Sequence, residues 1–237
     1  MAMGRTVRIV LWVFAVWAAV ALCRTCWLTL VEVPQACMQP SFLAGDRLLV
    51  DRWQCGFRVP FMDFHAYHRW GRRRPAKGDW VVFNMPVAGN RPDTSALCVG
   101  RVMGCPGDTV WMGARGRACS HRSYAAGCIW PVAVPAARSY VQLCRWNAAI
   151  YHQTIRMHEP DSVAHIQENA SPYFRFAHNY YWMESGSDTS YFDSRVFGFV
   201  PEECLVGTVA CVAFSLNPDL PLHQAWRRGR FLASPYE

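Results

Sequence analysis

Three Gly-Asp pairs, each before or at the start of a short run of apolar residues, place the strongest constraint on the fold. The pairs are Gly45-Asp46, Gly78-Asp79 and Gly107-Asp108. Glycine and aspartate favour tight turns, and short runs of β-branched and aromatic residues between turns favour strands. The sequence therefore predicts a mostly β fold, with strands at 48–50, 81–83, 109–111 and 206–214.

An apolar run without a charge occupies residues 9–23, between Arg8 and Arg24. A spanning helix needs about 20 apolar residues, and arginines at both ends can extend a shorter run by reaching toward the headgroups. Such a run fits either a cleaved secretory signal peptide or an uncleaved membrane anchor. The small residues Ala19 and Ala21 lie inside the run rather than after it, which favours the anchor. The basic end is then expected in the cytoplasm and the rest of the chain outside.

The composition fits one globular domain with one membrane segment. Of 237 residues, 52% are apolar and 17% are charged, and the net charge of +7 comes from arginine, since Lys77 is the only lysine. A basic surface of this kind is solvated or faces anionic lipid. No nucleic-acid recognition motif accompanies it, so no nucleic-acid partner is expected. A helix is predicted at 143–157, ending before Pro160.

The eleven cysteines show no spacing typical of a metal site, so neither a metal nor a cofactor is expected. Cys119 and Cys128 bracket a short loop and would form a disulfide in an oxidising compartment. Most of the others lie in apolar runs, where cysteine behaves as a small buried apolar residue.

Four longer motifs follow one another along the chain. They are Val33-Pro34-Gln35-Ala36-Cys37-Met38-Gln39-Pro40-Ser41-Phe42 with Gly45-Asp46, then Lys77-Gly78-Asp79-Trp80-Val81-Val82-Phe83, then Gly100-Arg101-Val102-Met103-Gly104-Cys105-Pro106-Gly107-Asp108, and finally Tyr180-Tyr181-Trp182-Met183 with Asp193-Ser194-Arg195-Val196-Phe197-Gly198-Phe199-Val200-Pro201. In this order they resemble the boxes of bacterial signal peptidase I, which read (I/V)PSGSMxPTL with GDxLLV, GDxVVF, KRVxGxPGD, and YYFMxGDNRxNSxDSRxxGFVP. Each box alone is a weak signal, but the ordered set is strong.

The resemblance implies a fold of two antiparallel β-sheets with an N-terminal transmembrane helix and a short helix in an insertion. Three regions are expected on this basis. Residues 1–32 form the anchor and linker, residues 33–217 the catalytic-fold domain with a variable insertion at 112–172, and residues 218–237 a basic C-terminal tail. The implied location is the bacterial inner membrane, with the main domain on the periplasmic or outer side.

In active members of that family, a serine attacks the peptide bond of an exported preprotein and a lysine acts as its general base. A serine hydroxyl needs such a base, and a lysine serves only when a dry pocket keeps it neutral. In this chain the nucleophile position is Cys37 and the base position is Gly100. The serine that supplies an oxyanion donor is replaced by Gln35, and the serine that would contact the lysine by Tyr191.

The matching residues are those expected to form the scaffold near the site. They are Met38, Pro40, Arg101, Asp193, Ser194 and Arg195. The GDNR run of the family is replaced by Ser185-Gly186-Ser187-Asp188. A substitute base would have to come from Lys77, which precedes a turn and is expected to be exposed, or from a histidine such as His65 or His68.

Two classes of function stay open. One is an endopeptidase that removes signal peptides with weak, altered or thiol-based activity, and whose partners are exported preproteins and membrane lipid. The other is a pseudo-peptidase that keeps the fold and binds or regulates an active signal peptidase. The missing dyad favours the second class, because loss of a catalytic base costs several orders of magnitude in rate.

Overall fold

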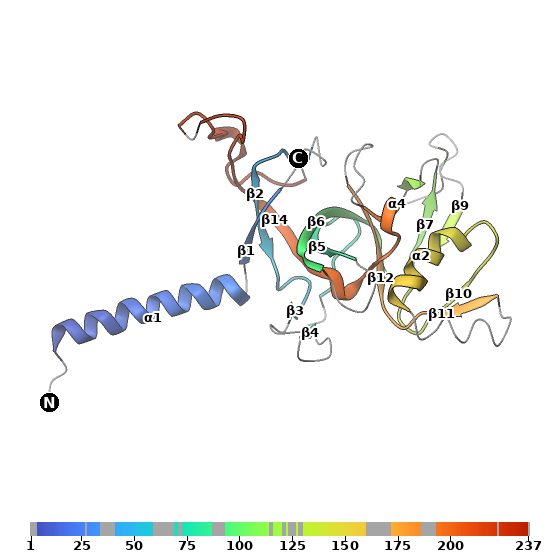
Figure 1. Cartoon of the computed structure of the whole chain (residues 1–237), viewed down its shortest axis with the longest axis horizontal. Helices are drawn as coiled ribbons and strands as arrows, with labels where there is room; N and C mark the ends of the chain where they lie inside the picture. The colour runs from blue at the N-terminus through green and yellow to red at the C-terminus, as the bar shows by residue number, and fades with distance from the viewer. Residues whose placement is uncertain are drawn as a thin grey trace.

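The structure is a computed structural model, and it describes residues 4–26, 28–33, 41–58, 69–70, 73–86, 93–113, 116–119, 122, 127, 130–159, 172–185, 193–221 and 223–236 (Figure 1). The helices are α1 (Arg5–Cys26), α2 (Ala148–His158) and α4 (Ser194–Phe197), with 3-10 turns at Glu202–Cys204 and Arg228–Arg230. The strands are β1 (Leu28–Glu32), β2 (Asp46–Asp51), β3 (Phe57–Arg58), β4 (Arg69–Trp70), β5 (Trp80–Met85), β6 (Asp93–Gly104), β7 (Thr109–Met112), β8 (Ala118–Cys119), β9 (Trp130–Ala133), β10 (Tyr140–Gln142), β11 (Tyr173–Arg175), β12 (Tyr180–Glu184), β13 (Val200–Pro201) and β14 (Leu205–Ser215). The four predicted strands are confirmed as parts of β2, β5, β7 and β14.

Most strands belong to one antiparallel sheet in the order β1-β2-β14-β5-β6-β12-β13. Three small sheets accompany it among the described residues: β8-β7-β9, β10-β11 and β3-β4. The expectation of two sheets is therefore wrong in number, although the mostly β, antiparallel fold is confirmed. The cause lies in the long strands, because β14 changes register twice against β2. Such irregularities bend a strand and increase its twist, so one continuous sheet curls instead of dividing in two.

The helix predicted at 143–157 is α2, which begins at Ala148 rather than Leu143. The preceding residues form a turn in which the Asn147 side chain accepts a hydrogen bond from the Cys144 amide at 2.6 Å and donates one to the Gln142 carbonyl at 3.0 Å. A side chain that bonds nearby backbone in this way competes with helical hydrogen bonds, so the helix starts only after it.

Helix α1 extends beyond the uncharged run at both ends. Its described large apolar side chains are exposed. Within the described residues, no helix combines the length and apolar character that crossing a membrane requires. The transmembrane helix expected at the N-terminus is therefore not found.

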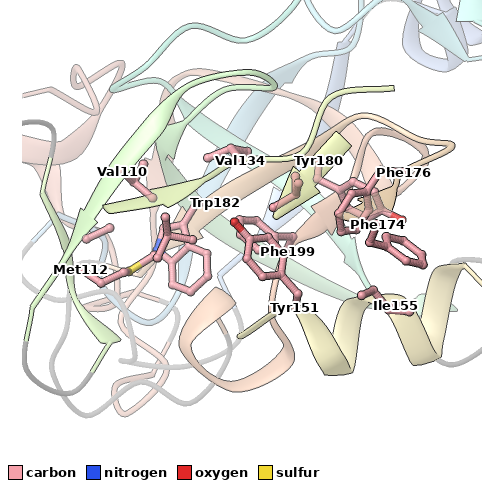
Figure 2. Close-up of a cluster of buried hydrophobic side chains, with 13 residues drawn as sticks. Val110, Met112, Val134, Tyr151, Ile155, Phe174, Phe176, Tyr180, Trp182 and Phe199 are labelled. Carbon is pink, nitrogen blue, oxygen red and sulfur yellow. The ribbon is translucent and has the colours of Figure 1, made fainter. Parts of the chain in front are cut away.

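Buried apolar side chains form three clusters. The aromatic core contains Val110, Met112, Ala118, Val132, Val134, Val141, Tyr151, Ile155, Phe174, Phe176, Tyr180, Trp182 and Phe199 (Figure 2). The central core contains Cys55, Val81, Phe83, Cys98, Val102, Tyr181, Met183, Phe197, Val200, Cys204 and Leu205. The N-terminal core contains Val31, Val33, Phe42, Leu48, Val50, Trp80, Val82, Val99, Val209 and Val212.

Strand β12 separates the aromatic core from the central core. Successive side chains of a strand point to opposite faces, so Tyr180 and Trp182 enter the aromatic core while Tyr181 and Met183 enter the central core. On the aromatic side, the ring of Trp182 meets Phe199 edge-on at 5.2 Å between centroids (Figure 2). A strand buried on both faces is fixed from both sides, which makes β12 a rigid support for nearby groups.

The basic C-terminal segment lies against the sheet and holds the turn at residues 41–46. Arg230 forms an ion pair with the fully buried Asp46 at 2.7 Å and donates a hydrogen bond to the Ser41 carbonyl at 2.9 Å. Arg227 donates to the Ala44 carbonyl at 3.0 Å. The expected basic tail thus clamps the turn that directly follows the motif carrying Cys37.

We predict that Arg230→Ala lowers the free energy of unfolding by about 2–4 kcal/mol, because it leaves the buried Asp46 carboxylate without its cation. The matched control is Arg47→Ala, which breaks the Arg47–Glu32 pair, where both side chains are substantially exposed. The control should lose less than about 1 kcal/mol. Urea unfolding of the full chain in detergent measures both. Equal losses in the two variants would show that the clamp does not stabilise the fold.

Candidate functional site

Gly100 lies in the middle of β6 and faces the central core. Its neighbours at alternate positions, Cys98 and Val102, are buried members of that core, and the period of two places Gly100 on the same face. Across the sheet Gly100 pairs with Val81 of β5. The position where the family resemblance places the general base is therefore in the interior, in apolar surroundings.

The space beside Gly100 is already filled. A Cβ atom at this position would lie 3.2 Å from Met183 Cβ, 3.2 Å from Phe83 Cε1 and 3.5 Å from the Glu184 carbonyl oxygen. The first two distances are shorter than ordinary van der Waals contacts. Strands β12 and β5 can therefore pack this closely on β6 because Gly100 has no side chain.

A buried ion pair stands at the end of β12. Asp193 is fully buried, and Arg195 donates to its Oδ2 from Nη2 at 2.6 Å. Ser185 donates to the same oxygen from its backbone nitrogen at 3.1 Å and from Oγ at 2.9 Å. These bonds join both ends of the segment 186–192, which contains Tyr191 and lies outside the described residues. The hydrogen bond to Asp193 also raises the pKa of the Arg195 guanidinium.

Ser194 connects this ion pair to the strand that packs on Gly100. Its Oγ accepts a hydrogen bond from the Met183 amide at 2.9 Å, and both groups are buried. Asp193 caps the short helix α4 by accepting from the Arg195 amide at 3.0 Å. The predicted scaffold residues Asp193, Ser194 and Arg195 therefore act together to fix the end of β12.

Glu184 follows Met183 directly in β12. Its side chain lies on the opposite face of the strand from Met183. It accepts hydrogen bonds from Trp182 Nε1 at 3.1 Å and from the Ala118 amide. Burial raises the pKa of Glu184 above its ordinary value. Its position beside Trp182 gives it no part on the Gly100 face.

Arg101 points away from the Gly100 face and is exposed. Its Nε donates to the Gly78 carbonyl at 3.0 Å, and the Gly78 amide donates to the Val102 carbonyl at 2.7 Å. Arg101 thus holds the Gly78-Asp79 turn. Lys77, which precedes that turn, is exposed as expected.

The structure does not describe the other residues that were predicted to lie near Gly100. Gln35, Cys37, Met38, Pro40, His65 and His68 lie outside the described residues. Two described histidines are engaged elsewhere: His178 bonds Glu203 at 2.8 Å, and His158 lies 6.4 Å from the ring of Tyr180, on the aromatic-core side of β12. Burial lowers the pKa of His158 to about 4.

The cysteines and other potential metal ligands form no metal site in the described part of the chain. There, no group of three or more His, Cys, Asp or Glu side chains is placed to hold a metal ion. Cys119 is disulfide-bonded, and its expected partner Cys128 lies outside the described residues. Cys98 and Cys204 are buried, as their apolar runs predict, but the same prediction is wrong for Cys211, which is only partly buried.

Three features of the site were missed by the sequence analysis. Phe83 was assigned only to a strand and Met183 only to the fourth motif, although both lie within 3.2 Å of a Cβ at Gly100. Ser185 was noted only as a departure from the family pattern, although it bonds Asp193. The third is the ion pair between Asp46 and Arg230, for which the sequence gave no local signal because the two residues lie 184 positions apart.

Comparison with known proteins shows the family of the chain. The family model described as "Signal peptidase, peptidase S26" matches residues 6–214. The chain is 23% identical over 245 residues to signal peptidase I of Buchnera aphidicola, covering 87% of this chain and 74% of that protein. It is 33% identical over 79 residues to signal peptidase I of Pseudomonas aeruginosa and 32% over 79 residues to that of Pseudomonas fluorescens, which in each case covers 33% of this chain and 25% of the relative. The chain belongs to the signal peptidase family, peptidase S26.

Proposed function

We propose that this chain is a signal peptidase-fold protein that does not cleave preproteins through a serine-lysine dyad and that serves instead as a binding or regulatory partner of an active signal peptidase. The observation that carries the proposal is the packing at Gly100. The base position has no side chain, and Phe83 and Met183 occupy the space where one would begin.

The chemical argument rests on the requirement for a positioned base. Peptide-bond cleavage by a hydroxyl or thiol needs a group that takes its proton and later protonates the leaving amine. Such a group must lie within hydrogen-bond reach of the nucleophile. The buried side chains of the central core, on the face of Gly100, are apolar groups, the thiols of Cys55, Cys98 and Cys204, and the phenol of Tyr181. Burial raises the pKa of the Tyr181 phenol. The phenol therefore stays protonated and does not act as a base.

The second candidate is a thiol-based signal peptidase, and one observation favours it. The nucleophile position holds cysteine, whose thiolate is intrinsically nucleophilic, rather than an inert residue. This function requires a base from another part of the chain. Lys77 is exposed at its turn, so a histidine such as His65 or His68 is the remaining source.

We infer further that α1 attaches the protein to the membrane and that residues 33–237 face the periplasmic or outer side. Support comes from family membership and from the described part of α1, whose apolar side chains include Trp12 at 70% and Trp17 at 66% exposure. Exposed tryptophan and aliphatic side chains on one helix favour contact with lipid.

We predict that Gly100→Ala lowers the free energy of unfolding by about 1–3 kcal/mol, because the new methyl group overpacks the interface between β6 and β12. Met183 Cβ is attached directly to the backbone and cannot rotate away. The control is Gly229→Ala, where no atom lies within 4 Å of the new Cβ, and which should change the value by less than about 0.5 kcal/mol. If both variants unfold at the same denaturant concentration, the space at Gly100 is not filled as described.

We predict that the purified full chain does not cleave a preprotein above background, because it lacks a base at position 100. The assay compares the natural protein, Cys37→Ala and the double variant Cys37→Ser with Gly100→Lys, beside a verified active signal peptidase on the same preprotein. Adding Phe83→Leu to the double variant removes one of the two closest atoms and makes room for the lysine.

If the natural protein cleaves the preprotein and Cys37→Ala abolishes this cleavage, the proposal is overturned and the thiol-based enzyme is established. Activity gained only by the lysine variants would support the proposal, because it locates the missing chemistry at the dyad positions. If the triple variant cleaves faster than the double variant, the packing of Phe83 is the reason that a lysine alone does not suffice.

We predict that the chain keeps its N-terminal helix and stays with the membrane fraction after alkaline extraction, because the apolar surface of α1 prefers lipid to water. Intact-mass measurement of the extracted protein checks the first part. A mature species that begins after Ala21 would show that residues 9–23 are a cleaved signal peptide.

A further inference from the structure

A cavity of about 540 Å³ opens on the side of β12 opposite to Gly100. Its walls come from β7, β9, α2 and α4, and they include Met112, Trp130, Trp146, Gln153, Trp182 and Arg195. We call it the tryptophan cavity. Its volume lies in the range of roughly 300–1,000 Å³ that small-ligand sites occupy, and its lining is mostly apolar with a few polar groups, as such sites require.

The tryptophan rings give the cavity its chemistry. Trp130 and Trp146 lie 6.1 Å apart between centroids, tilted by 36°, and they are 54% and 45% exposed. Trp182, by contrast, is almost wholly buried and belongs to the aromatic core. Large apolar side chains gathered at an open hollow mark a site of interaction. Indole faces bind aromatic and large aliphatic side chains by stacking and edge contacts.

Arginines dominate the exposed charge around the cavity, while the two nearby carboxylates are engaged inside the fold, Asp193 with Arg195 and Glu184 with Trp182. The segment 109–158, which supplies β7, β9 and α2, contains six arginines and no aspartate or glutamate. Arg145 directly precedes Trp146, and Arg156 follows Gln153 by one turn of α2, so that both lie beside lining residues. Both arginines are exposed. The surroundings therefore attract an anionic ligand and repel a cationic one.

We propose that the tryptophan cavity binds an acidic segment of a partner protein, which inserts one aromatic or large aliphatic side chain into the cavity, against the rings of Trp130 and Trp146. Carboxylates that flank this side chain pair with Arg145 and Arg156. A signal peptide begins with basic residues and lacks such carboxylates. The partner segment is therefore not the substrate of the family, and the proposal goes beyond the proposed function, since it holds whether or not Cys37 is a working nucleophile.

The position of the cavity favours a protein over a lipid surface. Helix α1 projects from one end of the molecule, and β7, β9 and α2 lie at the opposite end (Figure 1). A surface so far from the apolar helix faces the aqueous side when α1 contacts a membrane. The hollow shape also suits one inserted side chain better than a flat bilayer surface.

The test is calorimetric titration of the full chain in detergent with a short peptide in which glutamates flank a central phenylalanine. We expect saturable binding that weakens at least about tenfold when the phenylalanine of the peptide is replaced by alanine, because a buried aromatic anchor dominates such sites. Replacing the glutamates by lysines should abolish binding. Absence of saturable binding by the acidic peptide, or equal binding by the lysine peptide, would overturn the proposal.

Matched variants locate the binding. Trp146→Ala and Arg145→Glu should each weaken it at least about tenfold. Trp226→Ala, which removes a tryptophan of similar exposure (47%) at the C-terminal segment, and Arg228→Glu should leave the affinity unchanged. Unfolding midpoints of all four variants establish that they are folded. Equal affinities of Trp146→Ala and the natural protein would refute the site. Binding of anionic phospholipid vesicles that Trp146→Ala abolishes, without peptide binding, would assign the cavity to lipid instead.

Discussion

Burial of β12 on both faces is the constraint on which the described part of the site depends. On one face Met183 packs so closely against Gly100 that a Cβ at this position would force its neighbours to shift by a few tenths of an ångström. On the other, Trp182 packs against Phe199 and forms part of the tryptophan cavity. Because interiors are close-packed, neither face can accept a larger side chain unless β12 or its neighbours move. The strand thus links the predicted base position at Gly100 to the proposed binding surface, although the two lie in different cores.

Two buried ion pairs keep the frame of the site in place. Asp46 and Asp193 are both fully buried, and each has an arginine partner, Arg230 and Arg195. A buried carboxylate without a cation is strongly unfavourable, so these pairs hold their turns in defined positions. One turn follows the motif of Cys37, and the other ends the segment that contains Tyr191. Both carboxylates belong to motifs that resemble those of the signal peptidase family, whereas the residues at the predicted nucleophile and base positions, Cys37 and Gly100, differ from the family pattern.

This separation is physically reasonable because the fold and the reaction depend on different residues. Turns, strand pairing and buried ion pairs require glycine, apolar side chains and complementary charges. A serine-lysine reaction requires two particular side chains within hydrogen-bond reach, one of them desolvated. A glycine at position 100, where the family pattern has lysine, avoids burying a charge, and it allows β5, β6 and β12 to approach closely. Loss of the base is thus compatible with a well-packed core.

The sequence by itself determined the strands that follow the Gly-Asp turns, the helix near Ile150, and the family, because these depend on local turn chemistry, periodicity and the order of short motifs. The family resemblance also predicted that Gly100 stands at the position of the general base, and this stays a prediction. Only the tertiary structure decided that Phe83 and Met183 fill the space at Gly100, that Arg230 pairs with Asp46 across 184 positions of sequence, and that one curled sheet replaces two. The physical reason is that these features are contacts between segments distant in the chain. Their partners are chosen by how the strands curl and pack, and no local pattern of residues records that choice.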